Sequence, residues 1–240
     1  MTNSSHDDFI STVSHELRTP LTSIRGFAQT MLNSWDRLDD ASKKKFLQII
    51  EDQSNRLIHL VENILEVNKL QTAQKTNLHF KAVKVRNVID TVVAIVANQY
   101  KTRQFLIKQT CILPPIFADE DKFQQIMTNI IENAAKYSFE NTTINIDLAL
   151  KDNLVSIKVS DTGVEIAEKD YEKIFEKFSR LDSPLTRTVQ GNGLGLYITK
   201  NLIDRMNGKI LVSSNNKTTT FEILFPIHNI ETQAGSKCIQ

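Results

Sequence analysis

The sequence predicts two parts of different fold class, an all-α helical hairpin followed by an α+β sandwich domain. Two successive runs of apolar residues step by four and three, the spacing of helices that pack along a seam. After these runs, helical patterns are interleaved with stretches that alternate apolar and polar residues, as in a sheet covered by helices. We therefore expect a helical domain over residues 1–72, a linker over 73–77, the sandwich over 78–227 and a disordered tail over 228–240.

Composition and charge limit the class of protein. The chain has 240 residues, with 29 Lys and Arg against 28 Asp and Glu. This balance points neither to nucleic acid nor to an anionic membrane as a partner. The longest apolar run, residues 92–97, is far short of the ~20 residues that a membrane span needs, although a membrane anchor in a longer chain stays open. Cys111 and Cys238 fit no metal spacing and favour a reducing, cytoplasmic compartment.

Each of the two predicted helices carries one seam, and a loop over residues 33–41 joins them, with Asp39 or Asp40 as the N-cap of the second helix. A lone hairpin cannot cover both of its apolar stripes, so we expect a homodimer that forms a four-helix bundle. The alternative is a hairpin that packs on its own downstream domain. The seam residues are Ile10, Ser14, Leu17, Leu21, Ile24, Ala28 and Met31, then Phe46, Ile50, Gln53, Leu57, Leu60, Ile64 and Val67.

Segment 14–20, Ser-His-Glu-Leu-Arg-Thr-Pro, combines three reactive groups in the first helix. His15 lies one position past a seam residue, so its imidazole flanks the packed stripe. Its reference pKa of about 6.5 leaves the ring neutral near pH 7, and Glu16 can hold one ring nitrogen protonated while the other attacks an electrophile. Thr19 reaches the same space one turn on, and Pro20 predicts a kink. The alternative is an ordinary surface histidine.

The sandwich domain is predicted from the order of its periodic segments. Helices are expected over residues 85–100, 119–137, 167–176 and 193–206, the second of them capped by Asp119. Strands are expected over residues 105–110, 143–150, 154–159, 210–213 and 219–225, with turns at Asp152-Asn153 and Asn215-Asn216. These elements predict a mostly antiparallel sheet packed against helices.

Three stretches of this domain carry groups suited to a nucleotide. Asn129, Asn133 and Lys136 lie along one helical face, where carboxamide oxygens suit a hard cation and the ammonium suits phosphate, and Tyr137 offers a ring to a base. Asp161 ends a strand and can accept the amine of adenine, since Gly163 lets the backbone pass close to the ring. The amides of segment 191–196, Gly-Asn-Gly-Leu-Gly-Leu, can converge on phosphate at a helix N-terminus. Each stretch alone is equally compatible with an ordinary polar helix face or turn.

Taken in order, five segments resemble the boxes of the sensor histidine kinases of two-component signalling. Segment 14–20 resembles the H box and segment 129–137 the N box. Segments 161–163 and 191–196 resemble the two glycine boxes, and the phenylalanine box around Phe175 and Phe178 lies between them. The resemblance covers residues 5–226. It implies that the sandwich is an ATP-binding domain of the GHKL, or Bergerat, type, with ATP and Mg²⁺ as cofactors.

The resemblance also implies a role for each matching residue. In the hairpin, His15 would accept the phosphoryl group, Glu16 would polarise its ring, and Thr19 would position water when the phosphoryl group is removed from the partner. That partner would be the receiver domain of a response regulator. In the sandwich, the implied contacts are Asn133 with Asn129 to Mg²⁺, Lys136 to phosphate, Tyr137 and Asp161 to the base, and Gly163, Gly191, Gly193, Leu194, Gly195 and Leu196 around the nucleotide. Segment 176–190 would form a mobile lid, with Arg180 or Arg187 available to the γ-phosphate.

One position departs from the family pattern Asp-x-Gly-x-Gly, because Glu165 stands where a second glycine is expected. If the backbone at 165 needs positive φ, a non-glycine residue costs about 1–2 kcal/mol. A carboxylate facing the triphosphate would add repulsion, so we expect ATP affinity to be weakened on the order of tenfold. The alternatives to an active kinase are an impaired nucleotide-sensing or scaffolding dimer, a protein that acts chiefly as a phosphatase through Thr19, and another ATPase of the same fold, against which the His15 segment argues.

Overall fold

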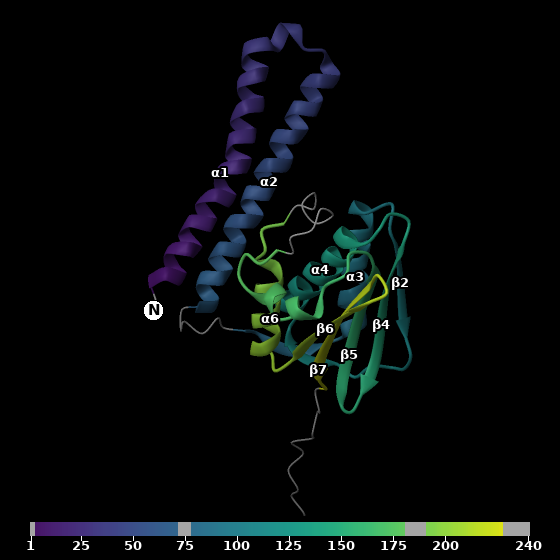
Figure 1. Ribbon diagram of the computed structural model, residues 1–240. Helices are drawn as coiled ribbons and strands as arrows, with labels where there is room; N and C mark the ends of the chain where they lie inside the picture. The colour runs from purple at the N-terminus through teal and green to yellow at the C-terminus, as the bar shows by residue number, and fades with distance from the viewer. Residues whose placement is uncertain (1–2, 72–77, 181–190, 228–240) are drawn as a thin grey trace, which may run out of the picture. The chain divides into compact units, whose positions relative to one another are not determined.

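The computed structural model describes residues 3–71, 78–180 and 191–227 (Figure 1). The chain divides into two compact units, Met1–Lys75 and Thr76–Gln240. The expected linker, the expected tail and Arg187 lie outside the described residues. None of the helices in the described ranges has the length and apolarity that a membrane crossing requires.

The first unit is a helical hairpin. Helix α1 (Asn3–Ser34) continues through Pro20 and is followed by the short 3₁₀ helix η1 (Trp35–Arg37) and by α2 (Asp40–Gln71). The carboxylate of Asp39 accepts a hydrogen bond of 2.7 Å from the amide of Ser42, which makes Asp39 the N-cap. Phe27 of α1 and Phe46 of α2 pack with their ring centroids 5.1 Å apart.

The two predicted seams are only partly covered within this hairpin. Met31, Leu60 and Val67 are buried where α1 meets α2. Several large apolar side chains of the same helices are about half exposed: Ile10, Leu21, Leu47, Ile58 and Leu65. One hairpin therefore leaves apolar side chains exposed. Ile10 and Leu21 belong to the first predicted seam, whereas the exposed residues of α2 lie beside the second.

The second unit is a two-layer α+β sandwich. Its main sheet has five strands in the order β2-β4-β5-β7-β6. Their bounds are β2 (Gln104–Gln109), β4 (Thr143–Lys151), β5 (Leu154–Thr162), β6 (Lys209–Asn215) and β7 (Thr218–Pro226). Only the β2–β4 pair is parallel. Helices α3 (Val85–Gln99), α4 (Glu120–Tyr137) and α6 (Gly195–Arg205) lie on one face of the sheet (Figure 1).

The core fills the space between this sheet and α4. Alternation along each strand places one set of side chains on the helix side, which explains why β4, β5 and β7 each bury every second residue. Phe123 of α4 meets Phe225 of β7 edge to face, with ring centroids 5.7 Å apart. Asp119 caps α4 as predicted, because its carboxylate accepts from the amide of Lys122.

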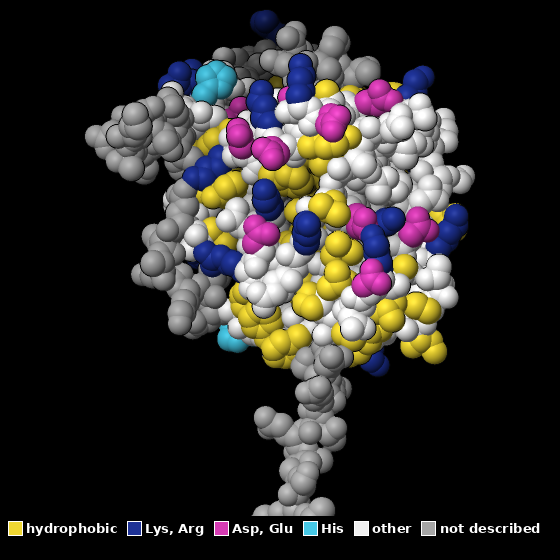
Figure 2. Space-filling view, turned by 60° about the horizontal axis from the view of Figure 1, so that its bottom comes forward, with side chains coloured by type: hydrophobic (Ala, Val, Ile, Leu, Met, Phe, Trp, Pro, Cys, Tyr) yellow, Lys and Arg dark blue, Asp and Glu magenta, His cyan; other side chains and the backbone are white. Residues whose placement is uncertain are grey.

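The surface of the molecule agrees with the balanced composition. On the face shown in Figure 2, acidic and basic side chains are interspersed among apolar ones, with no large region of a single sign. A field of one sign on this face would have indicated a polyanionic or polycationic partner.

Two sequence predictions differ from the structure. The helix expected over residues 167–176 is wrong, because this stretch forms two 3₁₀ turns, η2 (Glu168–Asp170) and η3 (Lys173–Phe175). Tertiary bonds to β6 hold it instead: the Tyr171 hydroxyl accepts from the amide of Ser214 at 2.6 Å and bonds its carbonyl at 3.2 Å. The small antiparallel sheet of β1 (Phe80–Val83) and β3 (Ile116–Asp119) was not predicted, since four-residue strands carry little alternation.

Candidate functional site

A cavity of about 650 Å³, its open mouth included, lies at the ends of α4 and β5. Five of its lining residues were predicted from the sequence, namely Asn133, Tyr137, Asp161, Arg180 and Leu196. The remaining lining residues are Val164, Ile166, Ile174, Ser179, Thr219 and Phe221. The cavity thus combines apolar walls with a few polar groups, which is the usual composition of a small-molecule site.

Asp161 is the most unusual group in this cavity. The residue is 3% exposed, and its Oδ1 atom has no hydrogen-bond partner among the described residues. Burial raises the pKa of Asp161 to about 7, because an ionised carboxylate loses its hydration there. A buried acceptor without a partner is costly unless a ligand donates to it. The position therefore suits a ligand N–H group.

Gly163 joins the two walls of the cavity. A Cβ atom at this position would lie 2.1 Å from the carbonyl oxygen of Tyr137, so no other residue fits without moving the backbone. The amide of Val164 donates to the same Tyr137 oxygen at 3.2 Å, and the amide of Gly163 donates to the Lys217 carbonyl at 2.8 Å. This close crossing places the end of β5 against the end of α4.

The second glycine segment begins α6. Gly193 has φ of +67°, and a Cβ atom there would lie 2.6 Å from the carbonyl carbon of Phe178. Gly195 gives room to the carboxamide of Asn129, whose Oδ1 would be 2.3 Å from a Cβ atom. Leu194 is fully buried, whereas a Cβ atom on Gly191 would meet nothing within 4 Å. Glycine is therefore required by the backbone at Gly193, whereas at Gly195 it leaves the Asn129 carboxamide in its present position.

Two predicted site residues make other contacts. The Nδ2 atom of Asn129 donates to the hydroxyl of Thr199 on α6 at 2.8 Å, and the ammonium of Lys136 pairs with Glu132 at 3.3 Å. Neither residue lines the cavity. Of the two predicted metal ligands, only Asn133 does so. One carboxamide oxygen still fits a Mg²⁺ ion that arrives with a nucleotide, because such ions take most of their ligands from phosphates and water.

Thr219 was missed by sequence reasoning although the pattern of β7 contained a sign of it. Residues 219, 221, 223 and 225 point to the core, and Thr219 is the polar member of that set. It is buried, pairs with the Ser214 hydroxyl at 2.9 Å and donates to the Val164 carbonyl at 3.2 Å. A hydroxyl on an apolar strand face is a reason to look for a ligand or a buried network.

The strain expected at Glu165 is wrong. Glu165 does not have positive φ, so it costs no left-handed backbone. Its carboxylate accepts a hydrogen bond from the amide of Lys217, in the turn between β6 and β7 where Asn216 and Lys217 do have positive φ. The side chain is exposed and does not line the cavity. Glu165 thus holds this turn, and it does not face the cavity.

The predicted reactive segment of α1 is accessible. His15 is exposed, and the Thr19 hydroxyl donates to its carbonyl oxygen at 3.4 Å. Glu16 is partly covered and pairs with Arg56 of α2, with 3.7 Å between the charged atoms. The imidazole therefore lies free of the packed seam, next to a carboxylate whose position is set by the second helix.

The structure thus has a helical hairpin with an exposed histidine and a sandwich domain with a cavity of apolar walls and a few polar groups. A family model for the His Kinase A phospho-acceptor domain matches residues 5–73, and a model for the histidine kinase-, DNA gyrase B- and HSP90-like ATPases matches residues 118–229. The chain belongs to the sensor histidine kinases of two-component signalling.

One curated relative and two solved structures illustrate what the chain is similar to, the last of them in fold alone. The sensor histidine kinase WalK of Bacillus subtilis is 33% identical over 227 residues, which are 91% of this chain and 36% of WalK. Full-length ShkA in complex with AMPPNP is 26% identical with a TM-score of 0.67, over 91% of this chain and 45% of that one. The complex of histidine kinase ThkA with response regulator TrrA gives 24% identity and a TM-score of 0.70, over 92% and 61%. The chain spans between 28% and 48% of the length of the curated relatives it matches.

Proposed function

We propose that this chain phosphorylates itself on His15 with ATP and passes the phosphoryl group to an aspartate of a response-regulator receiver domain. The observation that carries the proposal is the cavity around Asp161, where a buried acceptor without a partner among the described residues lies between apolar walls. Adenine fits both features, since its flat ring suits the walls and its amine can donate to the carboxylate. The AMPPNP bound by the structural relative ShkA is a nucleotide of the same kind.

In the proposed reaction an imidazole nitrogen of His15 attacks the γ-phosphorus of ATP. The new N–P bond forms as the bond from phosphorus to the β,γ-bridging oxygen breaks, and ADP leaves with that electron pair. Glu16, the neighbouring carboxylate, accepts a hydrogen bond from the other ring nitrogen and stabilises the positive charge that develops on the ring. The protein's task is alignment and charge neutralisation, because the transition state of phosphoryl transfer is loose.

The phosphate end of the nucleotide would lie toward Asn133, Arg180 and the start of α6. An arginine at the cavity wall and the amides at a helix N-terminus both favour a polyanion. Asn133 would hold Mg²⁺ brought with ATP, and this ion supplies neutralisation of phosphate charge. Arg187, which lies outside the described residues, stays a prediction for the γ-phosphate.

The hairpin is proposed to dimerise through its exposed apolar stripe into a four-helix bundle. Leu21 on α1 and Ile58 on α2 are 53% and 55% exposed in one chain, and a second copy would cover such residues. The ThkA–TrrA complex makes a regulator docked on a kinase of this fold a reasonable partner. Removal of the phosphoryl group from the regulator with help from Thr19 is a further activity of the same segment that we propose to test.

Incubation with γ-labelled ATP tests the proposal. We expect acid-labile, base-stable label in the wild-type chain and none in His15→Ala, while both bind ATP with equal affinity. Addition of a receiver domain should then move the label from the chain to the regulator. ATP binding without any label in the wild-type chain would instead support the impaired, nucleotide-sensing dimer.

A further inference from the structure

The side chain of Arg103 connects the loop between α3 and β2 to the end of α4. Arg103 in this loop is half-buried, and its guanidinium spans to Ser138, the residue that ends α4. Nε donates to the Ser138 hydroxyl at 2.8 Å, and Nη2 donates to the Ser138 carbonyl at 2.9 Å. Nη1 donates to the neighbouring Thr102 hydroxyl at 2.6 Å. All three nitrogens of the planar fork are thus engaged, which fixes the plane of the group.

The backbone that carries Arg103 is itself held in place. The amide of Arg103 donates to the Tyr100 carbonyl at 2.9 Å, and the amide of Asn141 donates to the Thr102 carbonyl at 3.0 Å. The amide of Gln104 also donates to the Thr142 carbonyl at 3.1 Å, so the loop after α3 and the loop after α4 are bonded to each other on both sides of the arginine. Because its backbone is already fixed, the Arg103 side chain loses less conformational entropy when its guanidinium bonds Ser138.

Ser138 lies at the crossing that builds the cavity. Its amide donates to Ala134 and its hydroxyl to Ala135, so it closes the last turn of α4. It also bridges to Gly163, whose absent side chain leaves room for the backbone of residues 137 and 138. Tyr137, the residue before Ser138, lines the cavity together with Asp161. Whatever fixes Ser138 therefore fixes the distance between the two walls.

We propose that Arg103 is a positioning residue that sets the base-binding width of the nucleotide cavity by fixing Ser138 at the end of α4. Its charge also lies at a helix C-terminus, where carbonyl groups favour a cation. The inference rests on the proposed function, since it assumes that the cavity binds ATP. Arg103 touches no cavity-lining atom itself, so it acts through Ser138 and Tyr137.

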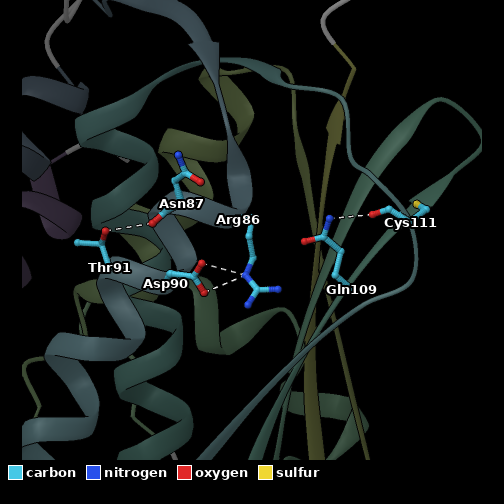
Figure 3. A network of polar contacts seen from close by, with 6 residues as sticks. All are labelled: Arg86, Asn87, Asp90, Thr91, Gln109 and Cys111. Atoms are coloured by element: carbon cyan, nitrogen blue, oxygen red, sulfur yellow. Dashed lines mark hydrogen bonds and ion pairs between the residues drawn. The ribbon is translucent and has the colours of Figure 1, made fainter.

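The matched control is Arg86 on α3. Its Nε donates to the two carboxylate oxygens of Asp90 in the same helix, at 2.8 and 3.0 Å. Two further hydrogen bonds lie nearby, from the Thr91 hydroxyl to the Asn87 carbonyl and from the Gln109 side chain to the Cys111 carbonyl (Figure 3). None of these residues lines the cavity. Arg86→Ala removes an arginine from the same unit and hydrogen bonds of similar length, but leaves the end of α4 unchanged.

The test compares wild type, Arg103→Ala, Arg103→Lys, Ser138→Ala and Arg86→Ala by the ATP dependence of His15 labelling in the full chain. Arg103→Ala should raise KM for ATP about fivefold or more and change kcat less than about twofold, because a wider cavity binds the base less well but leaves the phosphates and His15 unchanged. Arg103→Lys keeps the charge but not the planar set of donors, so its KM for ATP should lie between those of the wild type and Arg103→Ala. Arg86→Ala should match the wild type.

Thermal unfolding of each variant separates positioning from stability alone. If Arg103→Ala lowers Tm but leaves KM for ATP within twofold of the wild type, the inference is overturned. The double variant Arg103→Ala with Ser138→Ala should raise KM by less than the product of the two single effects, because both changes remove the bond from Nε to the Ser138 hydroxyl. Single effects on KM that multiply in full would also overturn the inference. A wild-type chain that binds no ATP would contradict the proposed function instead.

Discussion

Replacement of Asp161 by asparagine should make the nucleotide-free protein more stable and its binding of ATP weaker. The unfolded chain releases the Asp161 proton near pH 3.8, whereas the folded protein holds it up to about pH 7. Because the folded state binds this proton more tightly, the free energy of unfolding falls as the pH rises from about 4 to about 7 and is level above that. Asparagine has no ionisable proton, so the free energy of unfolding of the variant should not fall over this pH range.

The size of the effect follows from the same two values. The difference between 3.8 and about 7, at about 1.36 kcal/mol per pH unit, corresponds to about 4 kcal/mol of unfavourable free energy in the charged form. An asparagine at this position buries a neutral amide without its full set of partners, which costs about 1–3 kcal/mol. Asp161→Asn should therefore gain about 2 kcal/mol at about pH 8.5, and ATP affinity should fall at least about tenfold as the charge-assisted bond is lost.

Calorimetric unfolding of the full nucleotide-free chain at about pH 5.5 and about pH 8.5 measures this directly. The transition of the sandwich unit is identified by its upward shift when ATP is added to the wild type. The stability difference between Asp161→Asn and the wild type should grow by about 2 kcal/mol between the two pH values. A difference that is the same at both would refute the reasoning, since the carboxyl would then not be desolvated in the folded protein.

Three further substitutions test other parts of the structure. Gly163→Ala should destabilise the sandwich by about 2 kcal/mol or more because its Cβ atom would meet the Tyr137 carbonyl, whereas Gly191→Ala, with open space around it, should leave the melting temperature unchanged in calorimetry. Ile58→Glu should convert the dimer to a monomer in light scattering with its helicity retained; Lys45→Glu, exposed on another side of α2, should stay dimeric. Titration calorimetry should show that Glu165→Gly changes ATP affinity by less than about threefold, a free-energy difference below about 1 kcal/mol. A tenfold gain in ATP affinity would restore the expectation that Glu165 impairs the site.

Elements with a long, regular pattern could be predicted from the sequence. The two seams predict α1 and α2, and the alternating residues of β4, β5 and β7 predict the central sheet, because each pattern repeats often enough to identify one buried face. Segment 167–176 failed for the opposite reason. Its conformation is set by bonds from Tyr171 to Ser214, 43 residues away, which no local pattern encodes.

Site residues could be predicted from the sequence where the residue type alone indicates a chemical use. They could not be predicted where packing decides which group a side chain contacts. Asp161, Asn133 and Tyr137 were singled out because few other residue types offer the same chemical groups, and all three line the cavity. Asn129 shares a helical face with Asn133 in the sequence, yet it bonds Thr199 because α6 packs on that side of α4. Likewise, Glu165 departs from a family pattern, but only the turn at Lys217 shows where its carboxylate goes.

The most direct test is to locate the phosphoryl group after incubation of the full chain with Mg²⁺ and ATP, by mass spectrometry of peptides prepared at neutral to alkaline pH. We predict one added phosphoryl group on the peptide that contains His15, on the imidazole itself, and labelling that is slower by at least about tenfold in Asp161→Asn at limiting ATP. A phosphoryl group on another residue, or an unmodified His15 in a chain that binds and consumes ATP, would contradict phosphotransfer through this histidine.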